Sequence, residues 1–220
     1  AKLVAERERE IRAFIPEEYW DLFADLNGNA GDIRMQVTRA NGEKYRPTSQ
    51  ELSDTALAKL KDANFVVSKR EDKPTTTKPT APYITSTLQQ AASTRLSFSV
   101  KKTMMLAQRL YEGGYITYMR TDSTNLSADA IADCRSHIES KYGKAYLPEK
   151  PISYSSKEGA QEAHEAIRPS NVTVMPSDLD KIDPDGVRLY ELIWRQFVAC
   201  QMTKAEFTSS SIVVEAGDFE

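Results

Sequence analysis

The sequence lacks long apolar runs and has only two cysteines. No apolar run in its 220 residues approaches the roughly 18 to 20 residues of a membrane-spanning helix, which excludes a membrane protein. Cys134 and Cys200 form no C-x-x-C pair, so the zinc sites built on such pairs are excluded. Both lie in helical patterns, where a buried thiol is expected, and they predict a reducing, cytoplasmic setting.

Motifs for several common chemistries are also missing. The chain contains no G-x-G-x-x-G, P-loop or G-x-S-x-G motif, so nucleotide binding of those kinds and hydrolase chemistry find no support. His164-Glu165 begins like the zinc-protease pattern H-E-x-x-H, but Arg168 stands where the second ligand belongs. No convincing D-x-D-x-E cluster is present, and we expect no metal ion to bind this chain.

Acidic residues are absent from residues 73–111, although the chain has a net charge of −3. The same stretch contains six basic residues: Lys73, Lys78, Arg95, Lys101, Lys102 and Arg109. Such a tract, rich in Ser and Thr hydroxyls, suits contacts with phosphates. A basic solvated surface explains these charges equally well, so both interpretations stay open on charge alone.

The N-terminal third mixes helical and strand patterns, which indicates an α+β fold. A helix is expected over the first dozen residues, ending before Pro16. Asn41-Gly42 predicts a tight hairpin turn, and Thr48 with Glu51 predicts a capped helix start. Strands are expected at residues 19–26, 33–38 and 65–70.

Residues 72–83 contain three prolines and are expected to form a linker. The periodicity beyond them is helical. Helices are expected at residues 84–96, 99–112, 128–141, near 158–167 and at 185–202. The first two have helix-turn-helix spacing, which ordinary bundles share. Residues 207–214 return to a strand that is expected to complete the first sheet, so that the helical domain is inserted into a β-rich one.

The segment after Gly113-Gly114 could carry chemistry. Tyr118 precedes Arg120 by two positions, and an extended backbone places both side chains on one face. A phenol with an ordinary pKa near 10 is a poor nucleophile, whereas a guanidinium favours the phenolate and stabilises charge on a phosphate. One tyrosine among ten is more often a packing residue, so the spacing by itself favours that ordinary role.

A second constellation lies at His164 and Arg168. These residues are four apart, so on a helical turn they share a face and can grip one phosphate. His137, on an apparently amphipathic helix, is expected to be an ordinary packing residue.

Three segments together resemble the type IA DNA topoisomerases, in their bacterial branch. Residues 115–123 look like the family's active-site motif, and residues 164–169 look like its second hallmark. Residues 81–92 are similar to the segment that opens its tyrosine-bearing domain. The resemblance runs in order along essentially the whole chain.

The resemblance implies roles for individual residues. Tyr118 forms a transient 5′-phosphotyrosine, Arg120 assists the attack, and His164 and Arg168 engage DNA near the scissile phosphate. The family relaxes negatively supercoiled DNA by passing strands through this break and reseals it without ATP. Further DNA contacts are expected from Thr117, Thr121, Asp122, Arg95, Lys101 and Lys102.

The resemblance also implies a domain plan. Residues 1–15 are the end of a base domain, and residues 16–78 with 204–220 form a β-rich arch. Residues 79–203 form the inserted helical domain, with a fold like that of the catabolite activator protein. Because both ends of the chain look cut, we expect an internal fragment of a longer protein.

Cofactor and partners follow from the same resemblance. Magnesium is bound by a toprim domain outside these residues, so the fragment alone is expected to be inactive. The expected partners are single-stranded or underwound DNA and the toprim and base domains of its own polypeptide, with no membrane, at the nucleoid of a bacterial cytoplasm. Two other classes remain as rivals: a non-enzymatic helix-turn-helix DNA-binding module, and a structural scaffold with no nucleic-acid role.

Overall fold

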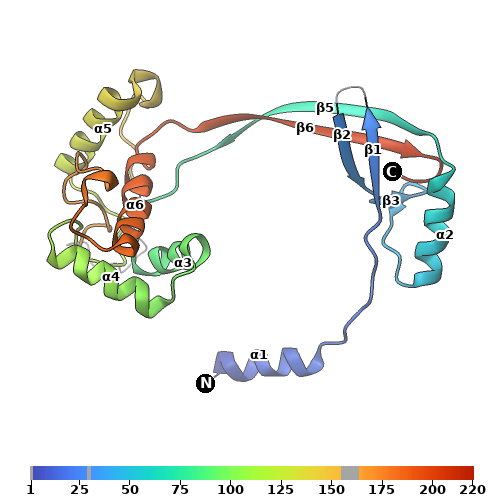
Figure 1. Ribbon diagram of the computed structural model, residues 1–220, viewed down its shortest axis with the longest axis horizontal. Helices are drawn as coiled ribbons and strands as arrows, with labels where there is room; N and C mark the ends of the chain where they lie inside the picture. The colour runs from blue at the N-terminus through green and yellow to red at the C-terminus, as the bar shows by residue number, and fades with distance from the viewer. Residues whose placement is uncertain (1, 29–30, 155–163) are drawn as a thin grey trace. The chain divides into compact units, whose positions relative to one another are not determined.

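The chain folds into a mixture of helices and strands. Its computed structural model describes residues 2–28, 31–154 and 164–220 (Figure 1). The chain divides into two compact units: Ala1–Pro74 with Thr208–Glu220, and Thr75–Phe207. The second unit is therefore inserted into the sequence of the first. No helix among the described residues combines the length and the apolar character that crossing a membrane requires.

The first unit begins with helix α1 (Lys2–Ala13), which ends ahead of Pro16 as predicted and buries none of its residues. Strands β1 (Phe23–Gly28) and β2 (Gly31–Gln36) form an antiparallel pair. The shorter strands β3 (Arg39–Ala40) and β4 (Glu43–Lys44) form another. Asn41 and Gly42 join them with φ values of 52° and 79°, the left-handed backbone of a two-residue hairpin, so that prediction is confirmed.

Helix α2 (Gln50–Lys61) starts one residue later than the sequence suggested. The side chain of Ser49, and not that of Thr48, accepts the hydrogen bond from the Leu52 amide. Thr48 as the cap was therefore wrong, because the next hydroxyl along the chain occupies the capping position. A small core in this unit consists of Leu22, Ala56, Leu60, Ala216 and Phe219.

Two long strands, β5 (Phe65–Thr77) and β6 (Ala205–Ala216), form a two-stranded sheet of their own (Figure 1). The linker predicted for residues 72–83 is wrong over its first half, where β5 continues. A two-stranded ribbon tolerates Pro74 because each strand has a free edge, and the β-branched threonines that follow favour a strand. The strand predicted at residues 207–214 is confirmed, but it does not join the sheet of β1 and β2.

The inserted unit contains four helices of twelve or more residues among its described residues: α3 (Thr85–Leu96), α4 (Val100–Glu112), α5 (Ala128–Tyr142) and α6 (Pro184–Ala199). Two short 3-10 turns, Lys144–Tyr146 and Pro176–Asp178, accompany them. Ser99, Ser127 and Asp183 each cap a helix by accepting a backbone amide. The predicted helix near residues 158–167 lies mostly outside the described residues, and the part from His164 onward is not helical.

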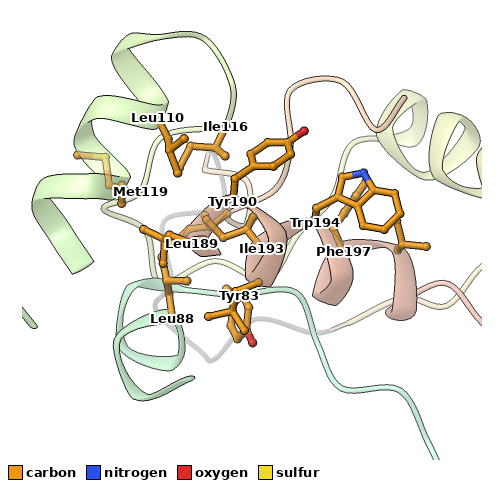
Figure 2. Close-up of a cluster of buried hydrophobic side chains, with 14 of the residues drawn as sticks. Tyr83, Leu88, Leu110, Ile116, Met119, Leu189, Tyr190, Ile193, Trp194 and Phe197 are labelled. Atoms are coloured by element: carbon orange, nitrogen blue, oxygen red, sulfur yellow. The ribbon is translucent and has the colours of Figure 1, made fainter. Parts of the chain in front are cut away.

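Helix α6 is the centre of the larger hydrophobic core, with eight buried residues. Figure 2 shows Leu189, Tyr190 and Ile193 of α6 among side chains from the other segments, including Ile116 and Met119. Cys134 and Cys200 are fully buried here, and burial raises the pKa of each thiol to about 12. The expectation of ordinary buried thiols is confirmed.

Candidate functional site

Tyr118 lies on a bent segment whose neighbours are anchored in the core. Ile116 is 2% exposed and Met119 is fully buried, whereas Tyr118 is 42% exposed. Both residues belong to the apolar cluster, and Figure 2 shows Ile116 beside Leu110. Burial of the flanking side chains therefore fixes the backbone on both sides of a tyrosine that faces solvent.

Two aromatic rings flank the phenol. The Tyr111 ring meets it edge-on at 5.3 Å between centroids, and the His164 ring lies 6.5 Å away. The Tyr118 hydroxyl makes no hydrogen bond with any residue that the structure describes. An exposed phenol held by ring contacts and free at its oxygen is available to a ligand.

Thr85, at the start of α3, ties down the backbone that follows Tyr118. Its amide donates to the Thr121 carbonyl at 2.9 Å, and its hydroxyl donates to the Met119 carbonyl at 2.8 Å. The same hydroxyl accepts the Thr121 amide at 3.0 Å. One threonine side chain thus holds both ends of the short segment that contains Arg120.

We expect Thr85→Val to destabilise the chain by about 1–3 kcal/mol, because it leaves part-buried backbone groups without their partner. Thr85→Ser keeps the hydroxyl and is expected to lose less than half as much. Denaturant unfolding of both variants measures the difference. Equal losses in the two variants would contradict a dominant role of the hydroxyl, because Thr85→Val removes only the hydroxyl and Thr85→Ser removes only the methyl group.

Thr117 connects the Tyr118 segment to residues 166–170. Its hydroxyl donates to the Ala166 carbonyl at 2.7 Å and accepts the Arg168 amide at 3.0 Å. Its own amide donates to the Arg168 carbonyl at 2.9 Å. The Thr117 hydroxyl, predicted to contact DNA, is thus engaged inside the protein, as is that of Thr121, which accepts the Ser123 amide.

Arg168 and Glu165 form an internal ion pair of 2.7 Å, with 15% and 31% of their side chains exposed. The other Glu165 oxygen accepts the Ser127 amide at 2.7 Å. Burial alone raises the pKa of Glu165, but hydrogen bonds from Ser127 and Arg168 together hold it below its usual value. The predicted helical face shared by His164 and Arg168 is wrong, because residues 164–168 are not helical and the amides of residues 166–168 donate to distant segments instead.

Glu165→Gln is expected to destabilise the chain by about 1–3 kcal/mol at neutral pH. A lowered folded-state pKa gives stability that is present above the unfolded pKa and lost as pH falls through the folded one. The gap between wild type and Glu165→Gln should therefore close below about pH 4. Urea unfolding at several pH values measures it, with Glu191→Gln, from an exposed ion pair with Arg195, as the control. A gap that persists unchanged at pH 3 contradicts the expectation.

A cavity of about 420 Å³ lies beside this segment and brings several predicted residues together. Arg120, Asp122 and His164 line it, and the buried Thr121 forms part of its wall. Its other lining residues are Ile84, Thr85, Ser86 and Gln89. The exposed Arg120 has no ion-pair partner in the described parts of the chain, in contrast to Arg168.

The basic residues of α3 and α4 lie elsewhere. The Lys102 ammonium contacts Asp185 and lies 4.3 Å from the centre of the Phe98 ring, so its charge is already paired. Arg95 and Lys101 are exposed. None of the three lines the cavity beside Tyr118.

Sequence reasoning did not single out Tyr111, Thr85, Glu165 or Gln89. Thr85 and Gln89 lie on α3, and Tyr111 lies on α4. The periodicity that predicts these helices does not show which other segments of the chain these side chains contact. Glu165 lies within the motif of residues 164–169, but its contact with Ser127 spans 38 residues, which the motif does not reveal.

Metal-ligating side chains do not cluster in the described part of this chain. The described residues contain no group of three or more His, Cys, Asp or Glu side chains that could hold a metal ion. These residues therefore do not fit a resident magnesium ion.

Comparison with known proteins gives consistent matches. A family model described as DNA topoisomerase matches residues 1–220. DNA topoisomerase 1 of Pseudomonas aeruginosa is 64% identical over 220 residues, and that of Escherichia coli is 59% identical over 219. The match covers 100% and 99% of this chain, respectively, but 25% of each relative, so the chain spans a quarter of their length.

A solved structure agrees with these relatives. Full-length topoisomerase I from Thermotoga maritima matches with a TM-score of 0.74 and 33% sequence identity. The match covers 99% of this chain and 35% of that one. Since the family match extends over every residue, the chain belongs to the DNA topoisomerase family.

Proposed function

We propose that this chain supplies the nucleophile of a type IA DNA topoisomerase. The Tyr118 oxygen attacks a phosphorus of the DNA backbone. A bond forms between this oxygen and the phosphorus, which stays on the 5′ end of one DNA fragment, and the bond from the phosphorus to the 3′ oxygen of the other fragment breaks. The phenol proton leaves to solvent or a base, and the departing 3′ oxygen takes up a proton. Because the phosphotyrosine is itself a phosphodiester, reversal reseals the strand without ATP, after another strand has passed through the gap.

The observation that best supports this proposal is the environment of Tyr118. Its phenol is exposed and lies next to His164, while Ile116 and Met119 on either side of it are buried. Arg120 and His164 line the adjoining cavity, where positive charge would stabilise the phosphate oxygens during attack. Asp122 is a further candidate DNA contact in this cavity. Arg168 is proposed to act indirectly, by holding the loop of residues 164–168 in place through its ion pair with Glu165.

The parts of the fold are assigned on the same basis. We propose that residues 79–203 correspond to a domain like the catabolite activator protein, with α3 and α4 as its helix-turn-helix. Residues 16–78 with 204–220 would then be a β-rich arch. The similarity to the Thermotoga maritima enzyme over 99% of the chain supports this correspondence.

The full activity is proposed to need more than these residues. A toprim domain of the whole protein would supply magnesium and its acidic ligands, and DNA at the bacterial nucleoid would be the substrate. We expect the purified 220-residue chain alone not to relax supercoiled plasmid. Magnesium-dependent relaxation by this chain would refute that expectation.

A covalent-adduct assay tests the function. The full-length gene product is mixed with 5′- or 3′-labelled single-stranded DNA and magnesium, denatured, and resolved by electrophoresis. The proposal requires protein attached to a 5′ end. No adduct, with salt-sensitive binding to single strands, favours a DNA-binding module. Absence of both binding and adduct favours a scaffold.

A further inference from the structure

The cavity beside Tyr118 is larger than contact with one phosphate requires. Its volume of about 420 Å³ lies within the range of roughly 300–1,000 Å³ typical of pockets for drug-sized molecules. Its lining comes from three segments: the start of α3, the residues after Tyr118, and His164. All of them belong to the compact unit Thr75–Phe207. A nucleotide has the size that such a cavity accepts.

Most of the polar side chains in the cavity have no hydrogen-bond or ion-pair partner among the residues that the structure describes. Thr85 and Thr121 are hydrogen-bonded to the surrounding backbone and form the wall. Five other polar lining residues make no side-chain hydrogen bond or ion pair with any described residue: Ser86, Gln89, Arg120, Asp122 and His164. Their hydrogen-bonding capacity is therefore available to a ligand.

The chemistry of these groups distinguishes a base from a second phosphate. Asp122 presents a carboxylate that repels a phosphate, while Arg120 offers only donors. The Gln89 amide has both a donor and an acceptor, as base edges do, and glutamine commonly reads bases through such pairs. The His164 ring offers a face on which a base can stack. A mixed lining of this kind matches a nucleobase.

We propose that an unstacked base of the strand attacked by Tyr118 occupies this cavity, and that Gln89 reads its edge. This inference rests on the proposed function, because the cavity is assigned to the strand by the proximity of His164 to Tyr118. The base belongs to a nucleotide close to the scissile phosphate. Gln89 is then a determinant of where the strand is cut.

Mapping cleavage sites tests the specificity. The full-length gene product is given random-sequence single strands and magnesium, and the strands in covalent adducts are sequenced. Wild type should prefer certain bases at one position near the break. Gln89→Ala should weaken that preference about tenfold. Gln90→Ala, an exposed glutamine of the same helix that does not line the cavity, should retain it. An equal preference in wild type and Gln89→Ala, or no preference near the break, overturns the assignment.

A binding experiment separates this inference from the nucleophile. The 220-residue chain carrying Tyr118→Phe is titrated into single strands with 2-aminopurine at successive positions. Fluorescence should change at one position as that base unstacks, and the change should be lost with Gln89→Ala but kept with Gln90→Ala. No responsive position, or equal responses in both variants, overturns the pocket. A missing adduct in wild type overturns the proposed function instead.

Discussion

Tyr118→Phe should abolish the covalent protein–DNA adduct while leaving the fold intact. The substitution removes only the hydroxyl, which makes no hydrogen bond in the described structure, and keeps the ring that contacts Tyr111 and His164. The phenol is the sole group that can form the phosphotyrosine under the proposed mechanism. Adduct yield should fall to background, and the melting temperature should stay within experimental error of wild type.

Neighbouring tyrosines provide matched controls. Tyr111→Phe removes a hydroxyl from a similarly exposed ring, 5.3 Å away, and should still form the adduct. Tyr115→Phe changes a part-buried ring that lies three positions further from Arg120 in the sequence, and this variant should also retain the adduct. An adduct formed by Tyr118→Phe, or lost equally in Tyr111→Phe, contradicts Tyr118 as the attacking group.

The elements that the sequence predicted well depend on local signals. The limits of α5 follow from Ser127, whose hydroxyl accepts an amide in the first turn, and from Gly143, which lies past its end with φ of 97°. Asn41-Gly42 encodes its hairpin in the same way, through two residues that accept a left-handed backbone. Such features need only neighbouring residues, so a single sequence reveals them.

The arrangement of the site depends on contacts between distant segments. Thr85 holds Thr121 across 36 positions, and the Ile167 amide donates to the Tyr83 carbonyl. This backbone pairing is why residues after His164 are not helical despite their spacing. Periodicity carries no information about such partners, so the sequence could nominate Tyr118 and Arg120 but not Thr85 or Gln89.

Arg120→Ala should slow adduct formation without loss of stability, whereas Arg168→Ala should mainly lose stability. Arg120 is exposed, unpaired within the described residues, and lines the cavity beside Tyr118. Its loss should slow adduct formation by about 10²–10³-fold, as removal of a group that stabilises transition-state charge does. The melting temperature should not change, because no side-chain hydrogen bond or ion pair with the described residues is lost.

Arg168 is 15% exposed and bonded to Glu165 and to the Pro169 carbonyl. Arg168→Ala leaves the Glu165 carboxylate without its cation, so the chain should lose about 2–4 kcal/mol of stability. Adduct formation should then recover substantially at low temperature, where the variant is folded, whereas Arg120→Ala should remain slow there. Stopped-flow or quenched adduct assays beside denaturant unfolding decide this. A stable Arg168→Ala protein that is slow at every temperature would place that guanidinium on the DNA instead of on the loop.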